Sequence, residues 1–324
     1  MSESNNGRWL LLIHQIPPKP NYLRVKIWRR LQRLGAVAIK NSVYALPKND
    51  QAQEDFQWVL REIIEGHGDG TLCEARLIDG VTDDHVEALF QSARNADYAQ
   101  IAEDARLLGK TLRVKVKPAE PRRLQLEHEI VRLRKRFDDV IAIDFFGAPG
   151  REAASGLVSG IEARIRGNKA TAYSQTRMDR EKLTDKIWVT RKGIHVDRMA
   201  SAWLVRRFID AEAKFKFVPA KGYKPLSNEI RFDMFEAEFT HEGDRCTFEI
   251  LIERVGIEDP ALIPIAEIIH DIDLKDGKFK RQEALGIERV IGGIAMSQKD
   301  DEIRLSRGAA VFNDLYEYFK RKRR

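Results

Sequence analysis

In the first eighty residues, segments with strand-like spacing of apolar residues alternate with segments that have helical spacing. Runs of adjacent or alternating apolar residues are typical of strands, and apolar residues three or four apart are typical of helices. The apolar run Trp9–Ile16 ends at two prolines, and the helical pattern Tyr22–Leu34 ends at Gly35, a residue favoured just after a helix. Two short strands within Ala36–Leu46, a helix over Phe56–Ile64 and a strand over Leu72–Ile78 follow.

This order of elements, strand-helix-strand-strand-helix-strand, predicts a ferredoxin-like domain with a four-stranded sheet and two helices on one face. After it, helical spacing predicts helices over Asp83–Leu108 and Leu124–Phe137, and a further helical segment running from Gly150 to about Leu183. The segment Thr111–Pro121 between them reads as a basic linker or short strand.

The second half of the chain mixes short strands with longer helices. The predicted strands are Ile187–Thr190, Lys214–Val218, Ile230–Phe232 and Cys246–Leu251, and the predicted helices are Arg198–Ile209, Ala261–Asp271, Glu283–Gly293 and Asp301–Phe319. The whole chain is therefore expected to be α+β: a ferredoxin-like domain followed by helices, then a second, helix-rich α/β domain.

The length of 324 residues exceeds what one hydrophobic core usually organises. We expect a ferredoxin-like domain with its following helices over 1–118, a basic helical connector over 119–184, and a C-terminal domain over 185–324.

Composition narrows the class of protein. The chain is 43% hydrophobic and 33% charged, as globular proteins are, and its one early apolar run is too short to span a membrane. Cys73 and Cys246 are the only cysteines, so a disulfide framework or cysteine-rich zinc module is excluded and a reducing, cytoplasmic location is expected. A net charge of +6 favours an anionic partner.

Three segments of the second half carry a family resemblance. The stretch Thr190–Asp210 contains Arg-Lys-Gly-Ile-His-Val-Asp-Arg, and the segments Phe239–Glu242 and Ile269–Asp273 each contain a histidine beside an acidic residue. These segments resemble the C-terminal domain of the ChrB family, and the segment Trp9–Pro47 resembles that family's N-terminal domain. The likeness therefore covers nearly the whole chain.

The resemblance implies a regulator of a chromate-resistance operon: a homodimer that binds double-stranded DNA and responds to chromate as its effector. Chromate is a tetrahedral dianion, which fixed guanidinium and ammonium groups near a helix N-terminus can bind. The residues expected to do so lie around the turn that follows strand Ile187–Thr190: Arg191, Lys192, Arg198 and Arg206. Arg206, next to Arg207, is equally well explained as part of a solvated helix face.

Histidines and carboxylates of the second half form a candidate metal site. The residues are His195, Asp197, His241, Glu249, His270 and Asp273, and such ligands suit zinc, iron or manganese. They lack the spacing of a known zinc motif, and a single histidine on a helix is more often a structural hydrogen-bonding group.

Basic residues of the first half form the candidate DNA surface, because Lys and Arg contact phosphates. One set lies on the first helix, Arg24, Lys26, Arg29, Arg30 and Arg33; a second lies in a basic stretch farther on and includes Arg122, Arg123 and Arg134. A solvated helix face is the alternative explanation for any single one of them. Trp28, Trp58 and Trp203 have core spacing and are expected to be buried.

The sequence bears on whether the chain is a regulator or an enzyme. Its first strand is similar to that of ferredoxin-like nucleases, but Gln15 stands where those nucleases place the metal-binding Asp, so DNA cleavage at that position is not expected. No nucleophile motif, phosphate loop or dinucleotide fingerprint is present, which favours a regulator over an enzyme. The alternative is a metal-dependent redox or hydrolytic enzyme of chromate detoxification with its site in the C-terminal domain.

Overall fold

The computed structural model describes residues 7–19, 21–112, 120–165, 177–219, 222–234 and 236–322, with the backbone alone at 120–124. Contacts divide the chain into two units. The N-terminal unit comprises Met1–Gln100 with Lys135–Arg151, and the C-terminal unit comprises Ile101–Arg134 with Glu152–Arg324. Each unit is thus assembled from two stretches of chain, whereas the ranges expected from the sequence follow chain order.

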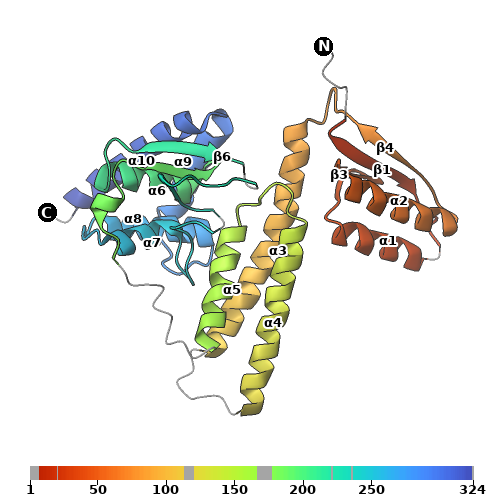
Figure 1. Cartoon of the computed structure of the whole chain (residues 1–324), viewed down its shortest axis with the longest axis horizontal. Coiled ribbons are helices and arrows are strands. Elements are labelled where there is room, and N and C mark those ends of the chain that lie inside the picture. Colours follow the sequence, from red (N-terminus) through yellow and green to blue (C-terminus); the bar gives the residue numbers. More distant parts are fainter. Residues whose placement is uncertain are drawn as a thin grey trace. The chain divides into compact units, whose positions relative to one another are not determined.

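The N-terminal unit contains the predicted ferredoxin-like domain. Its elements are β1 (Trp9–Gln15), α1 (Asn21–Arg33), β2 (Val37–Lys40), β3 (Val43–Pro47), α2 (Asp50–Glu65) and β4 (Asp69–Ala75). The sheet has the order β2-β3-β1-β4, and every neighbouring pair is antiparallel. Helices α1 and α2 lie together against one face of this sheet (Figure 1). The α+β class and the order of its elements are confirmed.

Apolar side chains at helical spacing fix α1 and α2 on the sheet. Leu23, Ile27 and Leu31 of α1 are buried, while the residues between them are mostly exposed. The expectation that Trp28 and Trp58 are core residues is wrong, because their side chains are 50% and 48% exposed. Both residues flank a buried helical stripe without belonging to it.

Three helices follow: α3 (Asp83–Leu112), α4 (Glu120–Ala142) and α5 (Arg151–Ile165). The first two are longer than the sequence pattern predicted, and Pro121 falls in the first turn of α4, where a missing N–H is tolerated. The middle of the predicted linker, 113–119, and the residues 166–176 beyond α5 lie outside the described residues.

Among the described residues from 177 onward, the C-terminal unit has a three-stranded sheet and five α-helices. Its elements are a 3₁₀ turn η1 (Arg180–Lys182), β5 (Ile187–Arg191), α6 (Val196–Phe208), β6 (Lys214–Val218), β7 (Glu229–Arg231), α7 (Thr247–Val255), α8 (Leu262–Leu274), α9 (Ala284–Ser297) and α10 (Asp301–Arg321). The strands run parallel in the order β6-β5-β7. Trp188, Trp203 and Phe248 are among the large side chains of its core, so the burial predicted for Trp203 is confirmed.

The predicted strand Cys246–Leu251 is wrong, because this segment begins helix α7. Its apolar residues suit either structure, but the flanking polar groups favour a helix. The Glu249 carboxylate accepts a hydrogen bond from the Cys246 backbone N–H, and Gly256 ends the helix with a left-handed φ of 68°. Phe248, Leu251 and Val255 then bury one face.

None of the helices within the described residues is both long and apolar enough to cross a membrane.

Candidate functional site

The turn between β5 and α6 carries the charged signature residues into the protein interior. Gly193 takes a φ of 74°, which an L side chain rarely adopts, and its N–H and that of Ile194 both donate to the Asp301 carboxylate at the start of α10. Helix α6 then begins at Val196, and all residues from Val196 to Val205 are buried. Asp197 and Arg198 therefore face other protein groups and not water.

Asp197 holds the start of α7. Its two carboxylate oxygens accept hydrogen bonds from the backbone N–H groups of Thr247 and Phe248, each at 3.0 Å. Burial, together with the nearby carboxylates of Asp273 and Asp233, raises the pKa of Asp197 well above its usual value. A negative charge at this position is costly unless a cation compensates it.

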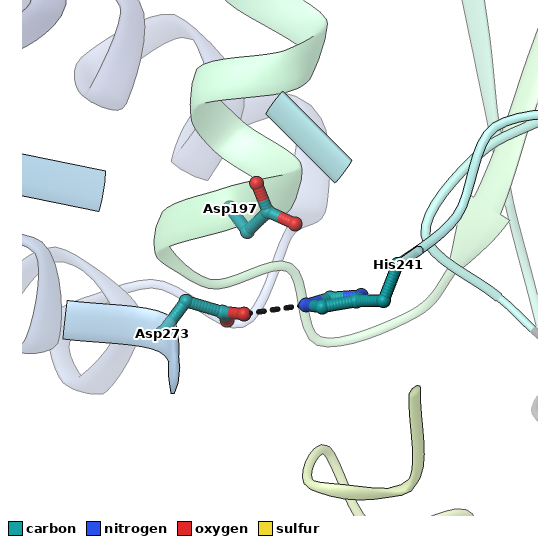
Figure 2. Close-up of side chains that lie close together, drawn as sticks. All are labelled: Asp197, His241 and Asp273. Carbon is teal, nitrogen blue, oxygen red and sulfur yellow. Dashed lines mark hydrogen bonds and ion pairs between the residues drawn. The ribbon is translucent and has the colours of Figure 1, made fainter. Parts of the chain in front are cut away.

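His241 lies between two carboxylates. Its Nε2 is 2.7 Å from an Asp273 oxygen and its Nδ1 is 3.4 Å from an Asp233 oxygen, as Figure 2 shows for the first contact. Burial alone would lower the pKa of His241, but the hydrogen bonds to Asp233 and Asp273 raise it well above the usual value. Helix α5 passes directly beside the His241 backbone, since a Cβ on Gly156 would come within 3.0–3.1 Å of His241 atoms.

Three of the six predicted metal ligands come together here. One ligand atom from each of Asp197, His241 and Asp273 lies within 4.8 Å of the other two. Figure 2 shows the three side chains converging from helix α6, from the loop before α7 and from the end of α8. One imidazole nitrogen and two carboxylate oxygens are donors that manganese, iron and zinc accept.

The other three predicted ligands lie apart from this cluster or serve other bonds. His270 Nδ1 is 2.7 Å from a Glu249 oxygen, and its Nε2 faces Asp276 at 3.3 Å. Both ring nitrogens are thus used to join the start of α7 to the loop after α8. His195 precedes α6 without making a side-chain cap bond, and it is exposed.

The four residues predicted to bind an oxyanion do not converge on one open pocket. Arg191 pairs with Glu152 at 2.6 Å, and Arg198 pairs with Asp233 at 2.9 Å, all four side chains being buried. Arg206 donates to the Ala213 carbonyl oxygen and lies over the Phe215 ring, and Lys192 is exposed. An oxyanion site built from these residues stays a prediction.

Sequence reasoning missed Glu152, Asp233 and Thr247. Thr247 Oγ1 donates to an Asp233 oxygen at 3.1 Å and contacts His241 Nδ1 at 3.4 Å. Glu152 lies on α5, far from the signature, and nothing in the sequence around it points to the site. Asp233 could have been noticed, because it follows β7 in a parallel sheet, where polar side chains often gather.

The basic face of α1 is partly neutralised. Lys26 and Arg30 both pair with Glu62 of α2. Arg24, Arg29 and Arg33 are exposed and form no ion pair with another described residue. In the second predicted DNA-contacting set, the side chains of Arg122 and Arg123 lie outside the described part of the chain, and Arg134 makes a bidentate pair with Glu162 at 2.7 and 2.8 Å.

A cavity of about 780 Å³ lies between α1 and the strands β1, β2 and β3. Arg24, Trp28 and Lys40 line it together with His14, which stacks on Tyr44 at 5.6 Å between ring centroids. Neither ring nitrogen of His14 has a hydrogen-bond partner among the described residues, and burial lowers its pKa. The cavity therefore combines cations with aromatic rings beside the unpaired arginines of α1.

Comparison with known proteins gives a family for the whole chain. Residues 24–178 match the family model described as "Protein ChrB, N-terminal", and residues 188–319 match "ChrB, C-terminal domain". Protein ChrB of Cupriavidus metallidurans is 28% identical over 337 residues, which cover 100% of this chain and 99% of that protein. No solved structure matches. The chain belongs to the ChrB family.

Proposed function

We propose that this ChrB-family chain is a chromate-responsive transcriptional regulator. Its N-terminal unit binds double-stranded DNA of a chromate-resistance operon, and its C-terminal unit responds to chromate. A homodimer in the cytoplasm is part of this proposal. The observation that carries it is the exposed set Arg24, Arg29 and Arg33 on α1, which no described acidic side chain neutralises.

The position of these arginines suits a nucleic-acid backbone. Arg29 and Arg33 are one helical turn apart, so their side chains leave α1 in nearly the same direction. Arg24 instead lines the cavity that Trp28 and Lys40 share. Guanidinium groups without protein partners are available to bind phosphates at no cost of breaking an ion pair, and each phosphate contact releases counterions.

For chromate to control DNA binding, it must bind the DNA-competent conformation and the DNA-incompetent conformation with different affinities. The C-terminal unit has the buried polar groups for this, but Arg191 and Arg198 are already paired with carboxylates. A dianion entering this region would meet Glu152 and Asp233 and be repelled. Chromate binding therefore requires either displacement of these carboxylates or an additional positive charge.

The test is fluorescence anisotropy on the chain's own upstream promoter DNA, with chromate, with sulfate as the matched dianion, and with neither. Chromate alone is expected to change the affinity. Equal curves in all three conditions would show that the chain is no chromate-responsive regulator of that promoter, and absence of specific binding throughout would remove the DNA-binding role as well.

The contribution of α1 is measured with the double variant Arg29→Gln/Arg33→Gln. We expect weaker DNA binding and a salt dependence whose log–log slope falls by about 0.9 for each phosphate that the variant no longer binds. The matched control is Arg76→Gln, which removes an exposed, unpaired arginine beyond β4. The DNA-binding surface would lie elsewhere if the double variant kept the wild-type slope of affinity against salt concentration. The same would follow if Arg76→Gln reduced that slope as much as the double variant does.

A second candidate function is an enzyme of chromate detoxification. The convergence of Asp197, His241 and Asp273 in one buried cluster favours it, because such groups bind metals or move protons. An enzyme would consume chromate catalytically when a thiol reductant is supplied, at a rate proportional to protein concentration. With a regulator, the chromate absorbance would fall no faster than it does with the thiol alone.

A further inference from the structure

We infer that Asp197, His241 and Asp273 form a binding site for one divalent first-row metal ion, with manganese, iron and zinc as the ions its donors fit. This inference concerns the C-terminal unit alone. It goes beyond the proposed regulator, because the ion can be present whether or not the N-terminal unit binds DNA.

The geometry of the three donors is close to that of a coordination shell. Metal bonds to imidazole nitrogen and carboxylate oxygen are about 2.0–2.2 Å long, so two ligands of one ion are at most about 4.4 Å apart. The three donor atoms here already lie within 4.8 Å of one another. The donor atoms are therefore at most about 0.4 Å farther apart than one ion allows, so small shifts of the side chains are enough to close the shell.

The carboxylates of the cluster lie around the His241 ring. Arg191 pairs with Glu152 and Arg198 pairs with Asp233, whereas Asp197 and Asp273 lie beside His241. A divalent ion bound by Asp197, Asp273 and the neutral imidazole takes the place of the ring proton that otherwise offsets the charge of these carboxylates.

The neighbours of the three ligands are arranged as metal sites usually are. His241 turns its other ring nitrogen toward Asp233 and Thr247, which fixes the ring orientation. Arg198 in turn holds Asp233 at 2.9 Å. The Asp197 oxygens are oriented by the two α7 amides, and each oxygen keeps one acceptor direction for a metal.

Three protein ligands leave coordination positions open. Asp197 and His241 are almost fully buried, but the Asp273 side chain is 24% exposed, so the site can be reached from solvent along that side. An ion there supplies the additional positive charge that a dianion needs in this region. An oxyanion oxygen is therefore the class of further ligand that the open positions fit.

The test uses the full-length chain. Metal content is first measured on protein purified without chelator; the protein is then stripped and titrated with Mn²⁺, Zn²⁺ or Co²⁺ by calorimetry, with thermal unfolding followed in parallel. We expect one ion per chain, a melting temperature that rises with ion concentration, and for Co²⁺ a visible absorption band of a nitrogen–oxygen ligand set.

Variants locate the ion. Asp273→Asn, at the partly exposed ligand, is expected to weaken binding more than about 100-fold, and Asp233→Asn about 10- to 100-fold, as loss of a supporting partner does. The matched control is His270→Gln, which breaks the other buried histidine–carboxylate pair of the same unit and should bind the ion as wild type does.

Three results would overturn the inference. They are a wild-type chain that takes up none of the three ions, an Asp273→Asn variant that binds as tightly as wild type, or a His270→Gln variant that loses binding as fully as Asp273→Asn. Because Asp273→Asn changes a side chain near the surface, its thermal transition reports whether it folds. DNA binding by the same samples shows separately whether the regulator proposal holds.

Discussion

At the scale of single residues, the buried charges of the C-terminal unit lie in pairs that join distant parts of the sequence. Arg191 and Arg198 were expected to face an anion, yet each is paired with a buried carboxylate, and these carboxylates lie 39 and 35 residues away along the chain. Periodicity and motif spacing carry no information on such long-range pairs. Asp197, His241 and Asp273 were among the six predicted ligands; their convergence required the fold.

His270 gives a residue-scale prediction on pH. Burial alone would lower its pKa, but Glu249 and Asp276 raise it above the usual value, with Lys278 acting in the opposite sense. A histidine whose pKa is raised by folding stabilises the protein below its unfolded pKa of about 6.5, and this stabilisation is lost as the pH rises through the folded pKa. The free energy of unfolding should therefore fall with pH above about 6.5.

The measurement is denaturant unfolding across this pH range in wild type and His270→Gln. The variant should lose part of the decline, which for one proton is at most about 1.4 kcal/mol per pH unit. His85→Gln, at an exposed position on α3, is the control and should keep the wild-type profile. Identical profiles for wild type and His270→Gln would contradict the assignment.

At the scale of elements, the sequence predicted most helices and strands because their apolar spacing is regular. One exception is the end of the segment predicted to be helical up to about Leu183, because 177–179 are not helical and Arg180–Lys182 form a 3₁₀ turn. Another exception is α7, where Phe-Glu-Ile-Leu-Ile follows Thr247, a composition that also suits a strand. What distinguished the helix was the capping by Glu249 and the amide contacts of Asp197, and the second of these is a tertiary contact. Burial of α6 along its first ten residues was predicted only at Trp203, because the charged pairs Asp197-Arg198 at the start and Arg206-Arg207 at the end of the helix are typical of an exposed helix.

The first turn of α10 gives an element-scale prediction. Asp301 accepts hydrogen bonds from the Gly193 and Ile194 backbone N–H groups and thereby fixes the turn that leads into α6. Asp301→Asn replaces one of the two accepting oxygens by an amide N–H₂, so we expect a loss of about 1–3 kcal/mol in the free energy of unfolding.

The matched control for this prediction is Glu302→Gln, which removes a carboxylate from the same helical turn. That carboxylate makes one long, exposed contact of 3.9 Å to Arg206. Both substitutions remove one favourable charge from the N-terminus of α10, so the difference between them reports the two backbone bonds together with the ion pair of Asp301 with Arg304 at 3.1 Å. Chemical denaturation measures both, and equal losses would mean that the Asp301 bonds contribute nothing beyond the helix dipole.

At the scale of the whole molecule, the part of the chain that the structure describes forms two large cores that share no residue. One includes Leu12, Ile27 and Phe56 of the N-terminal unit, and the other includes Trp203 and Leu251 of the C-terminal unit. The existence of two such bodies was predictable from length and from the change of pattern near residue 187. Their discontinuous membership was not, since contacts and not chain order assign Lys135–Arg151 to the N-terminal unit.

Separate cores predict separate responses to core damage. Leu12→Ala and Leu251→Ala each remove a fully buried side chain and should each cost about 2–5 kcal/mol. In a calorimetric scan we expect each substitution to lower one transition and leave the other in place. A common shift of both transitions in both variants would instead show that the two units unfold as one cooperative body.

The bonds that assemble the C-terminal cluster also have a kinetic meaning. Asp197 reaches Thr247 across 50 residues of sequence, and His241 reaches Asp273 across 32. Closing such loops costs chain entropy before any bond forms, so the cluster comes together only when most of the surrounding unit has condensed. Anything that recognises the assembled cluster therefore acts on the finished fold and not on a nascent chain. By mass action, a ligand that binds only the assembled cluster raises the free energy of unfolding in proportion to the logarithm of the ligand concentration.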